Sequence, residues 1–302
     1  MVMARWLETS IHKHQYIFGG NMGSLKFLYK VTRIEQCIIA GLSTWLIALL
    51  SNGPLWSNEP KVAAGVSMFF SCLGASLFHY GRRHDIYAKK WYDLVIVNQP
   101  LVLILSGAIA FLLSIAIAGV FLPAICTWIA LFNFAMIMFY ANFLDQYWPF
   151  KNLAIASVCV SPVVMGWYSG HRMHPIVPFL MAGIFCAYLA REVLKDNDDL
   201  AANRGKRFTM VMSLGMKTTQ RIAGALLFLS ILCFIGGLLQ LRYTELFSAA
   251  PVFIFFLIGM YFMINLAKRL LPGSYVSNRY RVIDLGMVNL MIATLMLRIT
   301  LY

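Results

Sequence analysis

Long apolar segments separated by short polar connections run along almost the whole chain. Nine of these segments approach the roughly 20 mostly apolar residues that a membrane-spanning helix needs. No connection is long enough to hold a soluble domain. The pattern therefore predicts a single all-α integral membrane domain over residues 1–302, with nine transmembrane helices. The predicted helices cover residues 35–51, 61–80, 101–119, 122–142, 152–169, 175–191, 219–240, 248–267 and 282–300.

Positive charges indicate how these helices are oriented. With the N-terminus inside, nearly all of the 25 Lys and Arg residues fall in inside connections or at inside helix ends. The positive-inside rule predicts this distribution for an odd number of spans. We therefore expect a cytoplasmic N-terminal arm at 1–34 and two cytoplasmic polar loops, at 79–98 and 191–218. The residues left outside are Lys61, Arg172, Arg242 and Arg298.

Composition agrees with the membrane interpretation. Apolar residues make up 60% of the chain, charged residues only 12%, and the mean hydropathy is +0.73. Soluble domains carry about 25% charged residues. The net charge of +13 comes from short basic connections, so it indicates topology and attraction to anionic lipid, not nucleic-acid binding. The six cysteines lie in or beside apolar segments, where we expect them to pack as small apolar side chains.

The second polar loop contains the clearest chemical pattern. If the sixth helix continues through it, Glu192, Asp196, Asp199 and Asn203 form one stripe, because they are spaced by four, three and four residues. A stripe of acids suggests a compensating cation, and Mg²⁺ prefers carboxylates together with phosphate oxygens. Neighbouring basic side chains could bind a diphosphate directly. The alternative is an ordinary solvated loop of mixed charge. The basic residues are Lys195, Arg204, Lys206 and Arg207.

The first polar loop is less specific. Asp85 and Asp93 lie eight residues apart, with basic and aromatic residues between them. Alone, this pattern is typical of a basic segment beside a membrane with interfacial aromatics. Asp284, near the inside end of the last predicted helix, is a further candidate, or it pairs with a neighbour such as Arg281.

Taken together, these features resemble the UbiA superfamily of intramembrane prenyltransferases, over most of the chain. The strongest match is the run R-E-V-L-K-D-N-D-D at 191–199, followed by R-F-T at 207–209 and L-G at 214–215. A weaker match is Y-A-N-F-L at 140–144, followed by Lys151 and Asn152. Arg33 matches an arginine usual at the first helix. The stretch after the first acidic loop also matches, at Asn98, Pro100, Ser106 and Gly107.

The resemblance implies a UbiA-like helical bundle around a central cavity, and a mechanism. Two acidic motifs bind Mg²⁺, which binds the diphosphate of an isoprenoid donor and stabilises its departure. Aromatic side chains stabilise the allylic cation, and a lipophilic acceptor captures it. By resemblance, Asp85, Asp196 and Asp199 are the catalytic residues and bind the metal together with Asp93. The expected substrate-binding residues are Arg33, His84, Tyr140, Lys151, Lys195, Asn203 and Arg207.

The acidic motifs depart from the family pattern. In the first motif, His84 replaces an Asn, Ala88 replaces the second acid, and Asp93 is displaced by one residue, about 100° on a helix. In the second motif, Asn203 replaces the last acid. Two alternatives therefore stay open beside prenyl transfer: a membrane terpene cyclase, and a non-catalytic protein that binds lipid or a protein partner. A transporter is the general alternative for a protein with many helices. By family habit, we expect a cell inner or plasma membrane.

Overall fold

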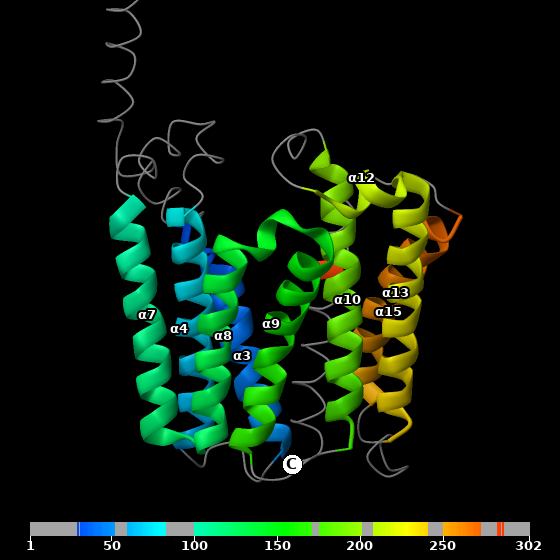
Figure 1. Cartoon of the computed structure of the whole chain (residues 1–302). Coiled ribbons are helices and arrows are strands. Elements are labelled where there is room, and N and C mark those ends of the chain that lie inside the picture. The colour runs from blue at the N-terminus through cyan, green and yellow to red at the C-terminus, as the bar shows by residue number, and fades with distance from the viewer. Residues whose placement is uncertain are drawn as a thin grey trace, which may run out of the picture.

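The computed structural model describes residues 29, 31–51, 59–82, 100–170, 175–200, 208–240, 250–272, 283, 284 and 286. The long elements within these residues are all helices, as predicted. They are α3 (Ile34–Ser51), α4 (Glu59–Arg82), α7 (Pro100–Phe121), α8 (Ala124–Asn142), α9 (Trp148–Ser169), α10 (Val177–Asp198), α13 (Met216–Leu238) and α15 (Ala250–Leu270). Two short helices, η1 (Leu144–Gln146) and α12 (Met210–Leu214), lie at one end of the bundle (Figure 1).

Prolines help to set where several helices begin. Pro100 is the first residue of α7, and Pro149 and Pro178 lie in the first turn of α9 and α10. A proline at such a position costs little, because the first N–H groups of a helix have no partner within it.

Each of the first eight predicted apolar segments corresponds to one of the long helices. Among the described residues, α4, α7, α8, α9, α10 and α13 are long and apolar enough to cross a membrane, and α3 contains a shorter apolar run at Ile34–Leu49. The last predicted segment, 282–300, lies almost entirely outside the described residues, so the count of nine helices stays a prediction.

Several predicted boundaries need correction, most of all the end of the sixth helix and the start of the fifth. Helix α10 continues to Asp198 instead of ending near residue 191, α9 begins at Trp148 instead of 152, and α4 continues to Arg82 instead of ending at 80. The first parts of the polar loops at 79–98 and 191–218 are therefore helical. In α10 the reason is that its polar residues pair inside the bundle, so the apolar pattern ends before the helix does. In α4 the last residue, Arg82, is exposed and donates to Asn142 of α8.

The two larger apolar clusters of the described residues each join several helices, whose arrangement Figure 1 shows. One joins α10, α13 and α15, and includes Leu180, Leu227 and Phe234. The other joins α4, α7, α8 and α9, and includes Met68 and Met165. Helix α9 packs against both α3 and α10, so it connects the two clusters.

Close helix contacts depend on glycine. A Cβ atom built on Gly41 of α3 would lie 2.9 Å from the carbonyl oxygen of Gly65 of α4, and the reverse distance is the same. Gly74 of α4 and Gly107 of α7 form a similar pair, at 2.9 and 3.0 Å. Small residues allow membrane helices to pack backbone to backbone, and Gly65 and Gly74 have this role here.

Apolar side chains also cover the outer surface of the bundle. Leu101, Ile109 and Leu112 of α7, and Trp128 of α8, are more than half exposed. An apolar outer surface of this kind fits lipid tails, and a water-soluble protein rarely exposes so large a patch.

We expect Gly107→Ala to destabilise the protein by about 1–3 kcal/mol, the usual cost of overpacking. Its new methyl group would lie 2.8 Å from the backbone nitrogen of Phe78, which has no rotamer to change. Gly119→Ala is the control on the same helix, because its methyl group would meet only Thr127 Oγ1, at 3.9 Å. Thermal unfolding in detergent should show a lower midpoint for Gly107→Ala alone; equal midpoints would contradict the close contact.

Candidate functional site

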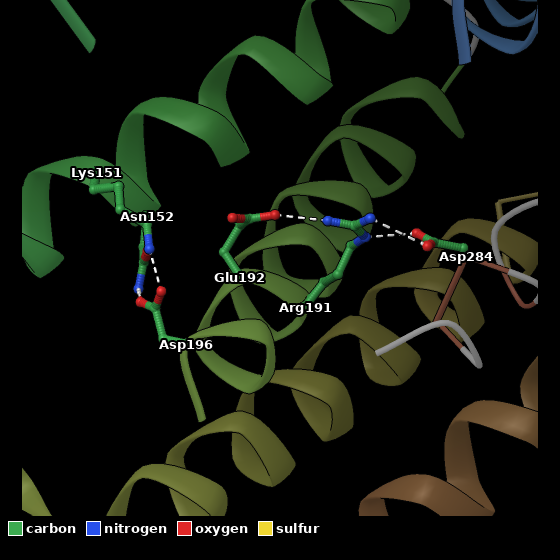
Figure 2. A network of polar contacts seen from close by, with 6 residues as sticks. All are labelled: Lys151, Asn152, Arg191, Glu192, Asp196 and Asp284. Atoms are coloured by element: carbon green, nitrogen blue, oxygen red, sulfur yellow. Dashed lines mark hydrogen bonds and ion pairs between the residues drawn. The ribbon is translucent and has the colours of Figure 1, made fainter. Parts of the chain in front are cut away.

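A buried ion pair joins α9 to α10 near the end of the bundle that carries η1 and α12. Lys151 Nζ donates to Asp196 Oδ1, and Asn152 Nδ2 donates to the other carboxylate oxygen at 3.3 Å (Figure 2). These three side chains are between 1% and 4% exposed. Such a pair is held only where hydrogen bonds satisfy both charges, because removing them from water is costly.

A second ion-pair group lies one helical turn deeper along α10. The guanidinium of Arg191 donates to both oxygens of Asp284, at 2.6 and 3.2 Å, and to Glu192 Oε1 at 2.6 Å (Figure 2). The two-pronged contact with Asp284 is the geometry that arginine favours for carboxylates. Arg191 thus attaches the segment containing Asp284 to α10. Within the described residues, Asp284 pairs with Arg191, 93 positions away in sequence, whereas the predicted partner Arg281 lies outside the described residues.

The acidic stripe predicted on a continuing sixth helix is confirmed for Glu192 and Asp196, which share one face of α10. Burial changes along the stripe. Glu192 and Asp196 are 2% and 1% exposed, whereas Asp199, the residue that ends the helix, is exposed. The stripe therefore leads from the surface into the bundle, as a path for a ligand with a charged head would require.

A backbone clasp holds this end of α9 in place. Phe208 N–H donates to the carbonyl of Gln146 at 3.0 Å, and Trp148 N–H donates to the carbonyl of Phe208 at 3.1 Å. Tyr147 and Phe208 form the isolated bridge between these segments. Lys151 lies one turn beyond Trp148, so the clasp fixes the start of the helix that carries it.

Arg33 and Tyr140 belong to another group, on α3, α4 and α8. The guanidinium of Arg33 lies over the ring of Tyr80, 5.5 Å from its centroid. The His79 ring lies 5.6 Å from that of Tyr140. Arg33 also has a positive φ of 46°, in the turn just before α3. Arg82, at the end of α4, donates to Asn142 at the end of α8.

The structure thus brings Lys151 and Asp196 into contact, and places Lys195 and Asp199 on the same end of α10. Sequence reasoning did not select Asn152 or Arg191 as site residues. Asn152 was adjacent to a selected residue, and Arg191 was a charge at the edge of an apolar segment; neither signal identifies a partner. The other predicted site residues lie outside the described residues. They are His84, Asp85, Asp93, Asn203 and Arg207.

Several buried polar atoms near the site have no hydrogen-bond partner within the described residues. Buried polar atoms without a partner are rare in native proteins and need an explanation. A bound ligand is one such explanation. They include acceptor atoms on α9 and α10, one amide donor on α10, and the hydroxyl that follows the clasp. These atoms are Asn152 Oδ1, Glu192 Oε2, both side-chain polar atoms of Asn197, and Thr209 Oγ1.

The geometry defines a class: a membrane-embedded helical bundle with a buried site of paired charges at one end. The model of the UbiA prenyltransferase family matches residues 97–274. This chain therefore belongs to the UbiA prenyltransferase family. The resemblance seen in the sequence is confirmed, and with it the prediction of an integral membrane prenyltransferase; membership favours an enzyme over the non-catalytic and transporter alternatives.

Two relatives of known name share the same name, digeranylgeranylglyceryl phosphate synthase. A digeranylgeranylglyceryl phosphate synthase of Methanoregula boonei is 29% identical over 213 residues, which are 65% of this chain and 71% of that protein. A protein of the same name from Methanococcoides burtonii is 28% identical over 256 residues, 78% of this chain and 89% of its own length.

Solved structures share the fold. A digeranylgeranylglyceryl phosphate synthase structure is similar with a TM-score of 0.67 and 18% identity, covering 91% of this chain and 98% of the other. A UbiA homologue from Archaeoglobus fulgidus bound to DMAPP and Mg²⁺ gives a TM-score of 0.64 at 13% identity, covering 90% and 98%. The predicted UbiA-like all-α fold is confirmed by these similarities.

Removing one partner of the α9–α10 ion pair should cost more than removing both. We expect Lys151→Met to lower the free energy of unfolding by about 3–5 kcal/mol, because Asp196 would stay buried without its cation. The double variant Lys151→Met/Asp196→Asn should recover most of that loss, since no buried charge remains. Thermal and denaturant unfolding in detergent give the free energies of unfolding of the wild type, the two single variants and the double variant. If the losses of the two single variants simply add in the double variant, the two residues do not form a direct pair.

Proposed function

We propose that this chain moves an isoprenoid group from a prenyl diphosphate to a lipophilic acceptor, with Mg²⁺, at the α9–α10 site. The observation that carries the proposal is the acidic stripe of α10, which leads from exposed Asp199 to buried Asp196 beside Lys151. A diphosphate needs a polar, cationic entrance, and an isoprenoid chain needs an apolar interior. Family membership supports the same reaction.

The residues present fit Mg²⁺ by their chemistry. The ion prefers a few carboxylates plus phosphate oxygens, and Asp196 and Asp199 supply carboxylates on one helix end. Among the described residues, no three His, Cys, Asp or Glu side chains gather closely enough to hold a metal alone. We therefore infer a set completed by the substrate and by Asp85 and Asp93. When bound, Mg²⁺ would neutralise charge on the leaving diphosphate.

Basic side chains at the site have a related role. Lys151 and Mg²⁺ would both be attracted to the Asp196 carboxylate, and the negative charge of a diphosphate allows both cations to stay. We infer that Lys151 and Lys195, together with Arg33 and Arg207, bind phosphate oxygens. His84, Tyr140 and Asn203 would complete the polar entrance of a central cavity that holds the isoprenoid chain.

The names of the relatives make the acceptor more specific. Two relatives are digeranylgeranylglyceryl phosphate synthases. The last transfer leading to such a product attaches a geranylgeranyl group to a hydroxyl of geranylgeranylglyceryl phosphate. That acceptor, with geranylgeranyl diphosphate as donor, is the first pair to test.

We infer the membrane arrangement from the same considerations. The single domain 1–302 would span the membrane nine times, with the N-terminus and both acidic loops in the cytoplasm. The cell inner or plasma membrane is the proposed location. The charge distribution of the sequence supports this topology.

We expect Asp196→Asn and Asp199→Asn each to lower prenyl transfer by at least 100-fold, because each removes a carboxylate from the diphosphate site. Asp198→Asn is the matched control, a charge at the same helix end but off the stripe. The assay follows radiolabelled geranylgeranyl diphosphate in lipid nanodiscs, with and without Mg²⁺.

Product analysis then separates the alternatives. An ether-linked product that requires Mg²⁺ and both acids supports transfer. A cyclic product without acceptor would identify a terpene cyclase instead. Absence of diphosphate release by a well-folded sample, across several donor chain lengths, would overturn the proposal.

A further inference from the structure

One oxygen of Glu192 has no partner in the described part of the protein. Glu192 is 2% exposed; its Oε1 accepts from Arg191 at 2.6 Å, while Oε2 is buried and makes no hydrogen bond. Asn152 on the facing helix α9 has the same feature, since its Oδ1 is buried and unpaired. Both atoms accept hydrogen bonds only. Two such atoms from facing helices are suited to a ligand that donates, such as a hydroxyl.

Glu192 lies deeper than the diphosphate residues. It precedes Asp196 by one turn of α10, about 6 Å along the axis, on the side away from the exposed end. Figure 2 shows its carboxylate between Arg191 on one side and the Lys151, Asn152 and Asp196 group on the other. In the proposed reaction, a diphosphate near Asp196 would leave its reacting carbon on this deeper side.

Cations and carboxylates surround Glu192 in equal number. Figure 2 labels Lys151 and Arg191 together with the carboxylates of Glu192, Asp196 and Asp284, and Lys195 of α10 is the third cation. Arg191 is shared between Glu192 and Asp284, and protonated Glu192 would leave the Arg191–Asp284 pair neutral. The charged or titratable groups facing Glu192 are Lys151 and Cys159 from α9, Arg191, Lys195 and Asp196 from α10, and Asp284 through Arg191.

We propose that Glu192 Oε2 receives the nucleophilic hydroxyl of the acceptor and takes its proton, with Asn152 Oδ1 beside it; this rests on the proposed function. The bond from the donor's C1 to the diphosphate oxygen breaks, and its electron pair leaves with the diphosphate. The acceptor oxygen bonds to C1, and its proton passes to Glu192. The proton returns to solvent after the ether product departs. In this scheme the acceptor is an alcohol.

Arg191 and Asp284 are positioning residues in this scheme. Arg191 holds Oε1 and so directs Oε2 away from itself, and Asp284 fixes the guanidinium by two hydrogen bonds. Asp284 would thus influence the reaction through Arg191.

The test compares wild type with Glu192→Gln, Glu192→Asp and Asp284→Asn in the full-length protein. Glu59→Gln is the control, because Glu59 is an exposed acid at the first residue of α4, outside the proposed site. Three quantities are measured: Mg²⁺-dependent binding of geranylgeranyl thiolodiphosphate, binding of geranylgeranylglyceryl phosphate alone, and the fraction of released diphosphate matched by ether product. Thermal unfolding checks that each variant is folded.

Loss of a general base usually costs about 100-fold or more. We expect Glu192→Gln to lower ether formation by at least that factor and to weaken acceptor binding about ten-fold, with donor binding within three-fold of wild type. Glu192→Asp should recover part of the transfer, and Asp284→Asn should lower the ether fraction with little effect on donor binding. A purely structural role would reduce diphosphate release and ether formation together.

Two results would overturn the assignment: an unchanged ether fraction in Glu192→Gln, or equal losses of donor binding and transfer. If the wild type binds the acceptor more tightly than Glu192→Gln does but releases no diphosphate, the proposed function and the proton transfer are both refuted. The hydroxyl-binding site itself would survive that result.

Discussion

The architecture of the site depends on keeping charge inside an apolar helix bundle. Lys151, Asp196, Arg191 and Glu192 are buried or largely buried between α9 and α10, and a buried charge is tolerated only with a partner. Each charge therefore dictates where its partner must be. The Lys151–Asp196 pair aligns the start of α9 with the end of α10, and the clasp at Phe208 holds that start in place.

Packing elsewhere allows this alignment. Membrane helices gain little from the hydrophobic effect between themselves, so they associate through close fit and a few polar contacts. Glycines such as Gly65 and Gly107 let α3, α4 and α7 approach backbone to backbone. Helix α9 then packs between α3 and α10, with its polar first turn facing the acidic stripe. Helix α9 thus presents Lys151 to α10.

The acidic residues along α10 differ in burial, which suits them to different parts of the proposed reaction. The exposed end at Asp199 suits a hydrated, metal-bound diphosphate, whereas Glu192 is enclosed and can act on an uncharged nucleophile. Electrostatic effects are larger where water is excluded, which favours proton transfer from a hydroxyl at the deeper position. The two carboxylates have the same chemistry, and in the proposed reaction their different depths would give them different tasks.

The sequence alone determined the fold class, the approximate helix positions and the acidic stripe. These depend on local pattern: apolar runs predict spans, and spacings of four and three place Glu192, Asp196 and Asp199 on one face of a helix. It also determined the family, because the run at 191–199 is contiguous. Only the tertiary structure decided that Lys151 pairs with Asp196, that Arg191 reaches Asp284, and that Glu192 Oε2 has no hydrogen-bond partner among the described residues. The first two contacts join residues far apart in sequence, and which side chains meet depends on helix packing, which no local pattern encodes.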